Sequence, residues 1–266
     1  MLSVSSRKKS AAPALPVGPG ADPAELASRL AFALPEPRCE LDHKDPWTLL
    51  VATILSAQST DRTVNTVTPL LFEKWPTPQA LAAAPRDEVE GVVHRTGFFR
   101  NKAKAIQGAS LAIAQQHGGQ VPKDMAALVA LPGVARKTAN VVLGVAYRIA
   151  EGVVVDTHVG RLARRLGWTR HADPVKVEAD LNALLPREAW VFASHALILH
   201  GRRVCPSRSP RCASCFLADV CPKVGVAPPK AAAGAAARKA GGAAGRPRAS
   251  AASRPGRRPA AGRRSR

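Results

Sequence analysis

Four cysteines lie within one short segment of the chain, and their spacing is that of a metal site. Cys205, Cys212, Cys215 and Cys221 follow the pattern C-x6-C-x2-C-x5-C, whereas Cys39 lies far upstream. Thiolates at this density can hold a tetrahedral zinc ion or an iron–sulfur cluster, and ligand softness does not distinguish the two. Structural disulfides are a weaker alternative, because nothing in the sequence indicates secretion and reducing compartments disfavour them.

A second candidate site is a turn between two short helices that we expect within residues 124–142. The turn L-P-G-V at 131–134 is typical of a helix-hairpin-helix. Glycine lets the backbone approach a partner closely, and the free N–H groups near Gly133 and Ala135 can hold a DNA phosphate. An ordinary αα-hairpin with the same turn is the alternative.

Lys137 lies in the first turn of the second helix, where the positive end of the helix dipole disfavours an ammonium ion. This position favours the neutral, nucleophilic amine, although a phosphate-binding or solvated lysine is the alternative. A helix to about Arg148 and an extended return to Val155 cover similar distances, so Asp156 can lie beside Lys137. An amine beside a carboxylate suits attack on a sugar carbon. Asp156 can also cap a helix that begins at Thr157.

Helices are the elements that we expect to position these groups. A capping side chain followed by proline marks helix starts at residues 22–23, 45–46, 77–78 and 173–174. Residues 47–57 are apolar on nearly every side, as in a buried central helix. The only strand-like run is 153–155, which is too short for a sheet. The sequence therefore predicts an all-α fold.

The formal charge of +20 is concentrated in the two ends of the chain. Residues 223–266 hold twelve Lys and Arg and no acid, and residues 1–21 hold three and no acid. We expect both to be disordered basic tails, because they carry too few apolar residues for a core. An Arg-rich arm favours nucleic acid as partner, with compositional drift as the alternative explanation. No signal peptide or membrane-length apolar run is visible, so we expect a cytosolic protein with no membrane role.

Taken together, the motifs resemble those of the endonuclease III family of helix-hairpin-helix DNA glycosylases. The resemblance spans nearly all of residues 24–222, with L-P-G-V-A-R-K-T-A-N-V-V, V-D-T-H-V-G-R and the cysteine pattern in that order. The segments L-L-V-A-T-I-L-S-A-Q-S-T-D at 49–61 and G-F-F-R-N-K-A-K-A-I at 97–106 extend it.

The resemblance implies two helical domains with a DNA-binding cleft between them. The six-helix domain with the helix-hairpin-helix maps to 39–151, and the iron–sulfur cluster domain to 22–38 plus 152–222. It further implies a [4Fe–4S] cluster on the four cysteines, with zinc as the less favoured occupant.

As activity, the resemblance implies a bifunctional DNA glycosylase and AP lyase that excises oxidised pyrimidines from damaged double-stranded DNA. The residue matching Lys137 would attack C1′, displace the base and form a Schiff base that permits β-elimination. Asp156 would activate the lysine or stabilise positive charge on the sugar. Extrusion of the base is least costly where its pairing is already damaged. We expect a monomer in the cytoplasm of a bacterium, associated with the nucleoid through DNA.

Further DNA contacts follow from the same resemblance. Gln58 matches a glutamine that fills the gap left by the flipped base, and Phe98 lies in the loop that wedges the opposite strand, unless it is a core residue. Ala135 occupies a position at which the hairpin often has a second glycine. If this position needs a positive φ, alanine should weaken the binding of DNA by the hairpin. Arg208 and Arg211 are phosphate contacts or solvated side chains. The full predicted DNA-binding set is Gln58, Phe98, Gly133, Ala135, Arg136, Arg208 and Arg211.

Two other functions compete with this interpretation. A monofunctional mismatch glycosylase of the same superfamily would not need a nucleophile at Lys137. A non-catalytic DNA-binding iron–sulfur redox sensor would use the hairpin for docking and the cluster for electron transfer.

Overall fold

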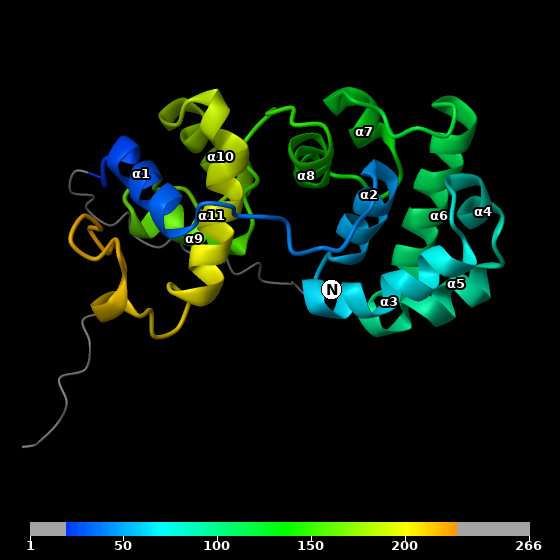
Figure 1. The fold of residues 1–266 in the computed structure, drawn as a ribbon, viewed down its shortest axis with the longest axis horizontal. Helices are drawn as coiled ribbons and strands as arrows, with labels where there is room; N and C mark the ends of the chain where they lie inside the picture. The colour runs from blue at the N-terminus through cyan, green and yellow to red at the C-terminus, as the bar shows by residue number, and fades with distance from the viewer. Residues whose placement is uncertain (1–19, 228–266) are drawn as a thin grey trace, which may run out of the picture. The chain divides into compact units, whose positions relative to one another are not determined.

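The computed structural model describes residues 20–227, and every regular element in that range is helical. The α-helices are α1 (Pro23–Ala33), α2 (Pro46–Leu55), α3 (Asp61–Lys74), α4 (Pro78–Ala83), α5 (Arg86–Val93), α6 (Phe99–Gln116), α7 (Met125–Ala130), α8 (Arg136–Ala146), α9 (Thr157–Arg165), α10 (Pro174–Leu184) and α11 (Trp190–Arg203) (Figure 1). Short 3-10 helices lie at His94–Thr96, Arg187–Ala189 and Cys212–Ser214. The all-α prediction is confirmed.

The four helix starts predicted from capping residues are observed. Asp22, Asp45, Thr77 and Asp173 each accept a hydrogen bond from a backbone N–H in the first turn of α1, α2, α4 or α10, and proline follows each of them. The first N–H groups of a helix have no partner within the helix. The capping side chain accepts a hydrogen bond from one of them, and proline removes another because it has no N–H.

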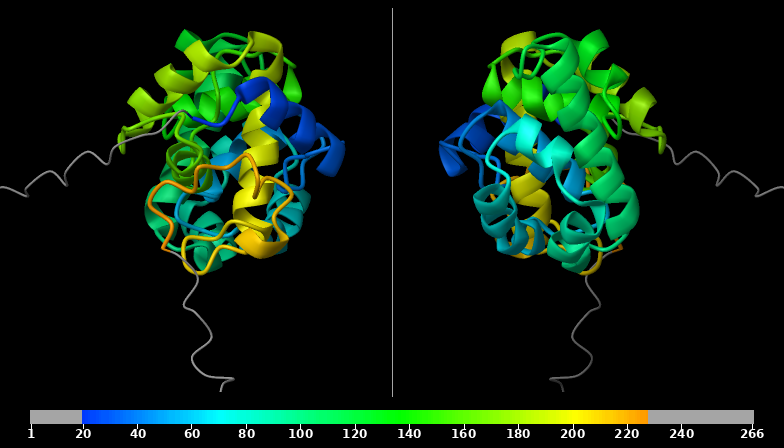
Figure 2. Two further views of the ribbon diagram at one scale, coloured as in Figure 1. Left: turned by 90° about the vertical axis from the view of Figure 1, so that its left-hand side faces the viewer. Right: turned by 90° about the vertical axis from the view of Figure 1, so that its right-hand side faces the viewer.

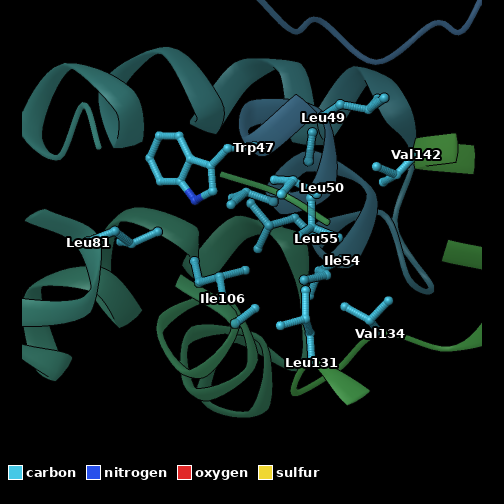
Figure 3. Packing of buried hydrophobic residues seen from close by; sticks show 14 of the residues in the cluster. Trp47, Leu49, Leu50, Ile54, Leu55, Leu81, Ile106, Leu131, Val134 and Val142 are labelled. Carbon is cyan, nitrogen blue, oxygen red and sulfur yellow. The ribbon is translucent and has the colours of Figure 1, made fainter. Parts of the chain in front are cut away.

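Helix α2 is the centre of the first of two hydrophobic clusters. All nine of its residues from Trp47 to Leu55 are buried, as the apolar run predicted. They pack against side chains from α3 to α8, including Ile106, Leu131 and Val142 (Figure 3). The indole N–H of Trp47 donates to the Ser110 hydroxyl at 3.1 Å, so the polar atom of this buried ring is satisfied.

The second hydrophobic cluster joins the first helix of the chain to the last ones. Leu26 and Leu30 of α1 pack with residues of α9, α10 and α11 and with Leu217 near the cysteines. Figure 1 and the side views of Figure 2 show α1 beside α11. Both clusters lie in one compact unit that extends to Val226. The domain boundaries drawn from the sequence stay a prediction.

Most of the two predicted tails lies outside the described residues. At their inner edges, however, the Ala21 N–H donates to the Leu166 carbonyl at 2.9 Å, and the Val224 N–H to the Arg165 carbonyl at 3.0 Å. Backbone hydrogen bonds to the rest of the described chain are therefore present at both of these inner edges. No helix in the described range is long and apolar enough to cross a membrane.

Two arginines at the end of α11 connect the two clusters. Arg202 Nη1 lies 2.7 Å from Asp61 Oδ2 at the start of α3, and it also pairs with Glu40. Arg203 Nη2 contacts the other oxygen of Glu40 at 3.1 Å. These exposed ion pairs contribute little stability individually, but as a network they link α11 to the chain just before α2.

Candidate active site

Lys137 and Asp156 line the same cavity, which has a volume of about 510 Å³. Lys137 lies exposed in the first turn of α8, within the first cluster of helices, whereas Asp156 directly precedes α9 in the second. Val155, Thr157, Gly160, Arg164, Ala172, Pro174 and Val177 complete the lining. Within residues 20–227 neither side chain forms an ion pair. The amine and the carboxylate therefore meet in one cavity without neutralising each other by direct contact.

Asp156 is fixed by its role as the N-cap of α9. Its Oδ1 accepts the backbone N–H groups of His158 and Val159, both at 2.8 Å. The other oxygen has no hydrogen bond to any described residue, which leaves it available to a group in the cavity. Capping and a role in the cavity are thus compatible for one carboxylate.

The segment before Asp156 is buried and extended, although it forms no sheet. The Val153 N–H donates to Asn182 Oδ1 at 2.9 Å, and the Val154 N–H donates to Ser194 Oγ at 2.8 Å. Side chains of α10 and α11 therefore replace the neighbouring strand that this valine run would otherwise need. By holding Val153 and Val154, these side chains also fix the position of Asp156 in the cavity wall.

The hairpin between α7 and α8 has the geometry of a close backbone approach. Gly133 has φ +75°, and a Cβ at this position would lie 2.5 Å from the Cβ of Ala105 in α6. Ala135 has φ −90° and ψ 165°, an ordinary extended conformation, so the missing second glycine causes no strain. The first backbone bond of α8 runs from the Ala139 N–H to the Ala135 carbonyl, which leaves the N–H groups of residues 136–138 free.

Arg136 has a partner inside the protein. Its Nε donates to Glu178 Oε1 of α10 at 3.0 Å, and Asn140 Nδ2 donates to the same oxygen at 3.1 Å. Sequence reasoning assigned Arg136 to DNA and missed Glu178. No local pattern marks a glutamate whose partners lie 42 and 38 residues away.

Gln58 and Phe98 both have left-handed backbone conformations and exposed side chains. Their φ angles are 54° and 48°, values that non-glycine residues seldom adopt and that often occur at functional positions. Phe98 is 64% exposed, so it is not a core residue, whereas Phe99 packs against the first cluster. Neither Gln58 nor Phe98 lines the cavity of Lys137 and Asp156.

Candidate cluster site

The four cysteines Cys205, Cys212, Cys215 and Cys221 line one cavity as free, half-buried thiols. Burial raises the pKa of the Cys215 and Cys221 thiols. In the part of the chain that the structure describes, no three Cys, His, Asp or Glu side chains are grouped to hold one metal ion.

Arg165 of α9 holds the loop that follows the first cysteine. This buried guanidinium donates through Nη1 to Cys205 Sγ at 3.0 Å and to the Pro206 carbonyl at 2.8 Å. Its Nη2 donates to the Ser207 carbonyl at 2.9 Å. Sequence reasoning missed Arg165, and the only available signal was an arginine on the apolar side of an amphipathic helix.

Arg208 and Arg211 are exposed on the same loop, and neither forms an ion pair with a described residue. The Arg211 N–H donates to the Val204 carbonyl at 3.0 Å, which closes the loop between the first two cysteines. Arg211 also lines the cysteine cavity. The two cations are therefore displayed on a loop whose backbone is fixed.

Burial shifts the pKa of two further groups, the buried His200 and the half-buried Cys39, toward their uncharged forms. Burial lowers the pKa of His200 to about 4, and its Nε2 lies 3.5 Å from Cys215 Sγ. Burial raises the pKa of the Cys39 thiol, as expected for an unreactive cysteine distant from the other four.

Comparison with known proteins identifies the family. A model described as "HhH-GPD superfamily base excision DNA repair protein" matches residues 51–187. Endonuclease III of Synechocystis sp. is 54% identical over 198 residues, which is 74% of this chain and 90% of the relative. Endonuclease III of Escherichia coli K12 is 41% identical over 197 residues, which is 74% of this chain and 93% of the relative.

The structural comparison agrees. A structure titled "Structure of a Trapped Endonuclease III-DNA Covalent Intermediate: Estranged-Adenine Complex" matches with a TM-score of 0.71 and 42% identity, over 75% of this chain and 94% of that one. The fold and the motifs thus define a base excision DNA repair protein, and the chain belongs to the endonuclease III family within the HhH-GPD superfamily. It is a DNA glycosylase with AP lyase activity.

Proposed function

We propose that Lys137 is the nucleophile of this enzyme and that Asp156 assists it. The observation that carries this assignment is the shared cavity, to which each cluster of helices contributes one of the two groups. At about 510 Å³ the cavity is in the range of sites for small organic groups, so an extruded nucleotide is a suitable occupant.

In the proposed reaction the neutral amine of Lys137 attacks C1′ of the extruded nucleotide. The C1′–N bond breaks, the base leaves with the electron pair and takes up a proton, and the amine loses one proton. The C1′–O4′ bond then breaks, O4′ takes up a proton, and the nitrogen lone pair forms the C=N bond of a protonated Schiff base. Removal of a proton from C2′ then drives β-elimination, in which the 3′ C–O bond breaks and the phosphate leaves with its electrons. The iminium nitrogen accepts electron density during this step.

Asp156 would act on the positive charge that develops at the sugar or take a proton from the amine. Its Oδ1 is held by two backbone N–H groups, and the free oxygen can interact with the cavity. A carboxylate fixed in this way needs little reorganisation during the reaction, which is what electrostatic stabilisation requires.

The proposed substrate is double-stranded DNA with an oxidised pyrimidine. The free N–H groups of the hairpin near Gly133 and Ala135 would hold a phosphate, and Arg208 and Arg211 would contact the backbone elsewhere. Gln58 would enter the space left by the base, and Phe98 would contact the opposite strand. Exposure and left-handed φ angles of both residues support these roles.

We also propose a [4Fe–4S] cluster on the four cysteines. Four thiols line one cavity, and four cysteine thiolates are the ligand set of such a cluster. Bound there, the cluster would supply a redox-active crosslink between the thiolates. Arg165 would donate a hydrogen bond to one ligand sulfur and hold the adjoining loop.

The state and location of the protein complete the proposal. Because one chain supplies all the groups named above, we propose that it acts as a monomer. Its relatives are bacterial proteins, which supports action in the cytoplasm on nucleoid DNA.

Borohydride trapping on a duplex with one oxidised pyrimidine tests the assignment. Lys137→Ala should form no covalent adduct and cleave no strand, while its Kd for the duplex stays within about threefold, since one exposed amine contributes little to binding. Lys176→Ala, an exposed lysine of α10, is the matched control and should trap normally.

An adduct with Lys137→Ala would contradict the assignment. Base release without an adduct in the wild type would support a monofunctional glycosylase. Binding without base release would support the redox-sensor alternative.

A further inference from the structure

Glu178 of α10 is a buried carboxylate with two partners on one helix of the other cluster. Its side chain is 11% exposed, and Oε1 accepts from Arg136 Nε at 3.0 Å and from Asn140 Nδ2 at 3.1 Å. Arg136 and Asn140 are one turn apart on α8, so both side chains reach the same point. A buried carboxylate is costly unless it is paired and hydrogen-bonded, and α8 meets both requirements.

The backbone between α8 and α9 is shaped to allow this contact. A Cβ on the buried Gly152 would lie 2.3 Å from Glu178 Oε1 and 3.2 Å from Asn140 Nδ2. Any larger residue at position 152 would therefore push Glu178 away from α8. The close packing indicates that the contact is an integrated part of the fold rather than a chance surface pair.

Helix α10 also holds the other side of the cavity. Asn182 lies four positions after Glu178, on the same face of α10, and accepts the Val153 N–H at 2.9 Å. Lys137 directly follows Arg136, and Asp156 follows Val153 by three residues. Pro174 and Val177 of α10 line the cavity itself. One helix therefore fixes both the amine-bearing helix and the carboxylate-bearing segment.

We propose that Glu178 and Arg136 are positioning residues that set the alignment of Lys137 with Asp156, and that Arg136 is not a phosphate contact. The proposal rests on the function assigned above to Lys137 and Asp156. Because the positive charge of Arg136 is paired with Glu178, it adds little to the attraction of a phosphate. Loss of the pair leaves α8 and α10 free to shift, and a shift of about 1 Å between reacting groups can lower a rate by roughly a hundredfold.

Four variants, the fourth being Arg136→Lys, and one control test the proposal in the full-length protein. Glu178→Gln removes the charge at nearly constant shape, Arg136→Gln removes the partner, and the double variant measures their coupling. Because Arg136 is 49% exposed and can be solvated when it loses its partner, Glu178→Gln should fold even if Arg136→Gln, which leaves the buried carboxylate unpaired, does not. The control is Arg187→Gln, which breaks the exposed Arg187–Glu151 ion pair in the same region but leaves the Glu151 backbone carbonyl in place as an acceptor for Arg136 Nη2.

Each variant is assayed in single turnover with excess enzyme, so that the rate constant does not depend on the active fraction. The measured step is adduct formation on a preformed abasic duplex, alongside Kd as a function of salt and the Tm. Glu178→Gln, Arg136→Gln and the double variant should all lower the rate by a similar factor, roughly ten- to a hundredfold. Arg136→Lys, which keeps the charge, should recover part of the loss, and the control should react as the wild type does.

Salt dependence separates positioning from phosphate contact. A phosphate contact at Arg136 would reduce the slope of log K against log salt by about 0.9, whereas a positioning residue leaves the slope unchanged. A reduced slope with a normal rate in Arg136→Gln would overturn the proposal, and so would a wild-type rate in Glu178→Gln or additive losses in the double variant. If the wild type itself forms no adduct, the function assigned to Lys137 has failed, which is a different outcome.

Discussion

Gly133 is a residue at which the backbone leaves no room for a side chain. A φ of +75° disfavours any residue with a side chain, and a Cβ added at position 133 would lie only 2.5 Å from the Cβ of Ala105. We expect Gly133→Ala to lower the free energy of unfolding by roughly 1 to 3 kcal/mol and to weaken DNA binding, because the hairpin must move. Urea unfolding and duplex titration measure the two effects.

Gly91 provides the control for this substitution. It lies within α5, and a Cβ there would meet nothing within 4 Å. Gly91→Ala should raise stability by about 0.5 to 1 kcal/mol, as expected for a helix interior. Equal stability of the two alanine variants would show that the hairpin tolerates a side chain.

His195 gives a pH-dependent prediction at the same scale. Burial lowers its pKa below the ordinary value of about 6.5, so below that pH the unfolded chain binds more protons than the folded one. The stability that neutral His195 provides is present above about pH 6.5 and is lost as the pH falls toward the folded value. His195→Gln should flatten the fall in unfolding free energy between pH 6.5 and 5, measured by urea unfolding.

His171 is exposed and serves as the reference position. His171→Gln should keep the wild-type pH dependence. A His195→Gln profile as steep as that of the wild type would rule out burial of this imidazole as the cause.

Individual residues were predictable where a local pattern marks them. The cysteine spacing and the lysine after a hairpin are visible in the sequence, and the return path through Val155 predicts that Asp156 lies near Lys137. Glu178 and Arg165 were not predictable, because each acts on partners about 40 residues away and has no local signature. The partner of Arg136 could not be predicted for the same reason, and the DNA-binding role expected for Arg136 stays a prediction.

At the scale of elements, α9 connects the two candidate sites. Its N-terminus is capped by Asp156, and Arg165 near its C-terminus holds the loop after Cys205. A displacement of the cysteine loop would therefore act on the same nine-residue helix whose first turn faces the cavity.

Removing the Arg165 side chain should loosen the cysteine loop. Arg165→Ala leaves the carbonyl groups of Pro206 and Ser207 and the Cys205 sulfur without their shared donor. We expect a loss of about 3 kcal/mol in unfolding free energy, because several buried hydrogen bonds to a charged group disappear together. Urea unfolding and metal content after gel filtration are the measurements. Arg170→Ala, an exposed position after α9, should change stability by less than about 0.5 kcal/mol.

Helix boundaries were the most predictable feature of the elements. Side-chain caps and prolines are local, and all four starts read from them are present. The valine run 153–155 shows the limit of such reading. Its extended form was expected, but the amide and hydroxyl groups that satisfy it come from α10 and α11.

At the scale of the whole molecule, the C-terminal end contributes positive charge. Residues 227–266 hold eleven Lys and Arg and no acid. Removal of these residues should flatten the salt dependence of nonspecific DNA binding, because fewer counterions are released, while single-turnover rates persist. Titrations at several salt concentrations measure the slope. Identical slopes for the full and shortened chains would exclude this segment from duplex contact.

The composition of the second hydrophobic cluster could not be read from apolar patterns alone. That α1 packs with the last helices was expected only from the family resemblance, because periodicity shows which face of a helix is buried and not against what. For example, the guanidinium of Arg29 in α1 donates a hydrogen bond to the carboxylate of Asp219, which lies 190 residues later in the sequence.

This long separation has a consequence for synthesis on the ribosome. Leu26 and Leu30 leave the exit tunnel early, yet the surfaces that cover them are translated more than a hundred residues later. The α2–α8 core can condense in the meantime, since all the segments that form it are translated before α9. During that interval α1 presents two unprotected leucines, and a nascent chain stalled before α11 would be a natural client for a holdase.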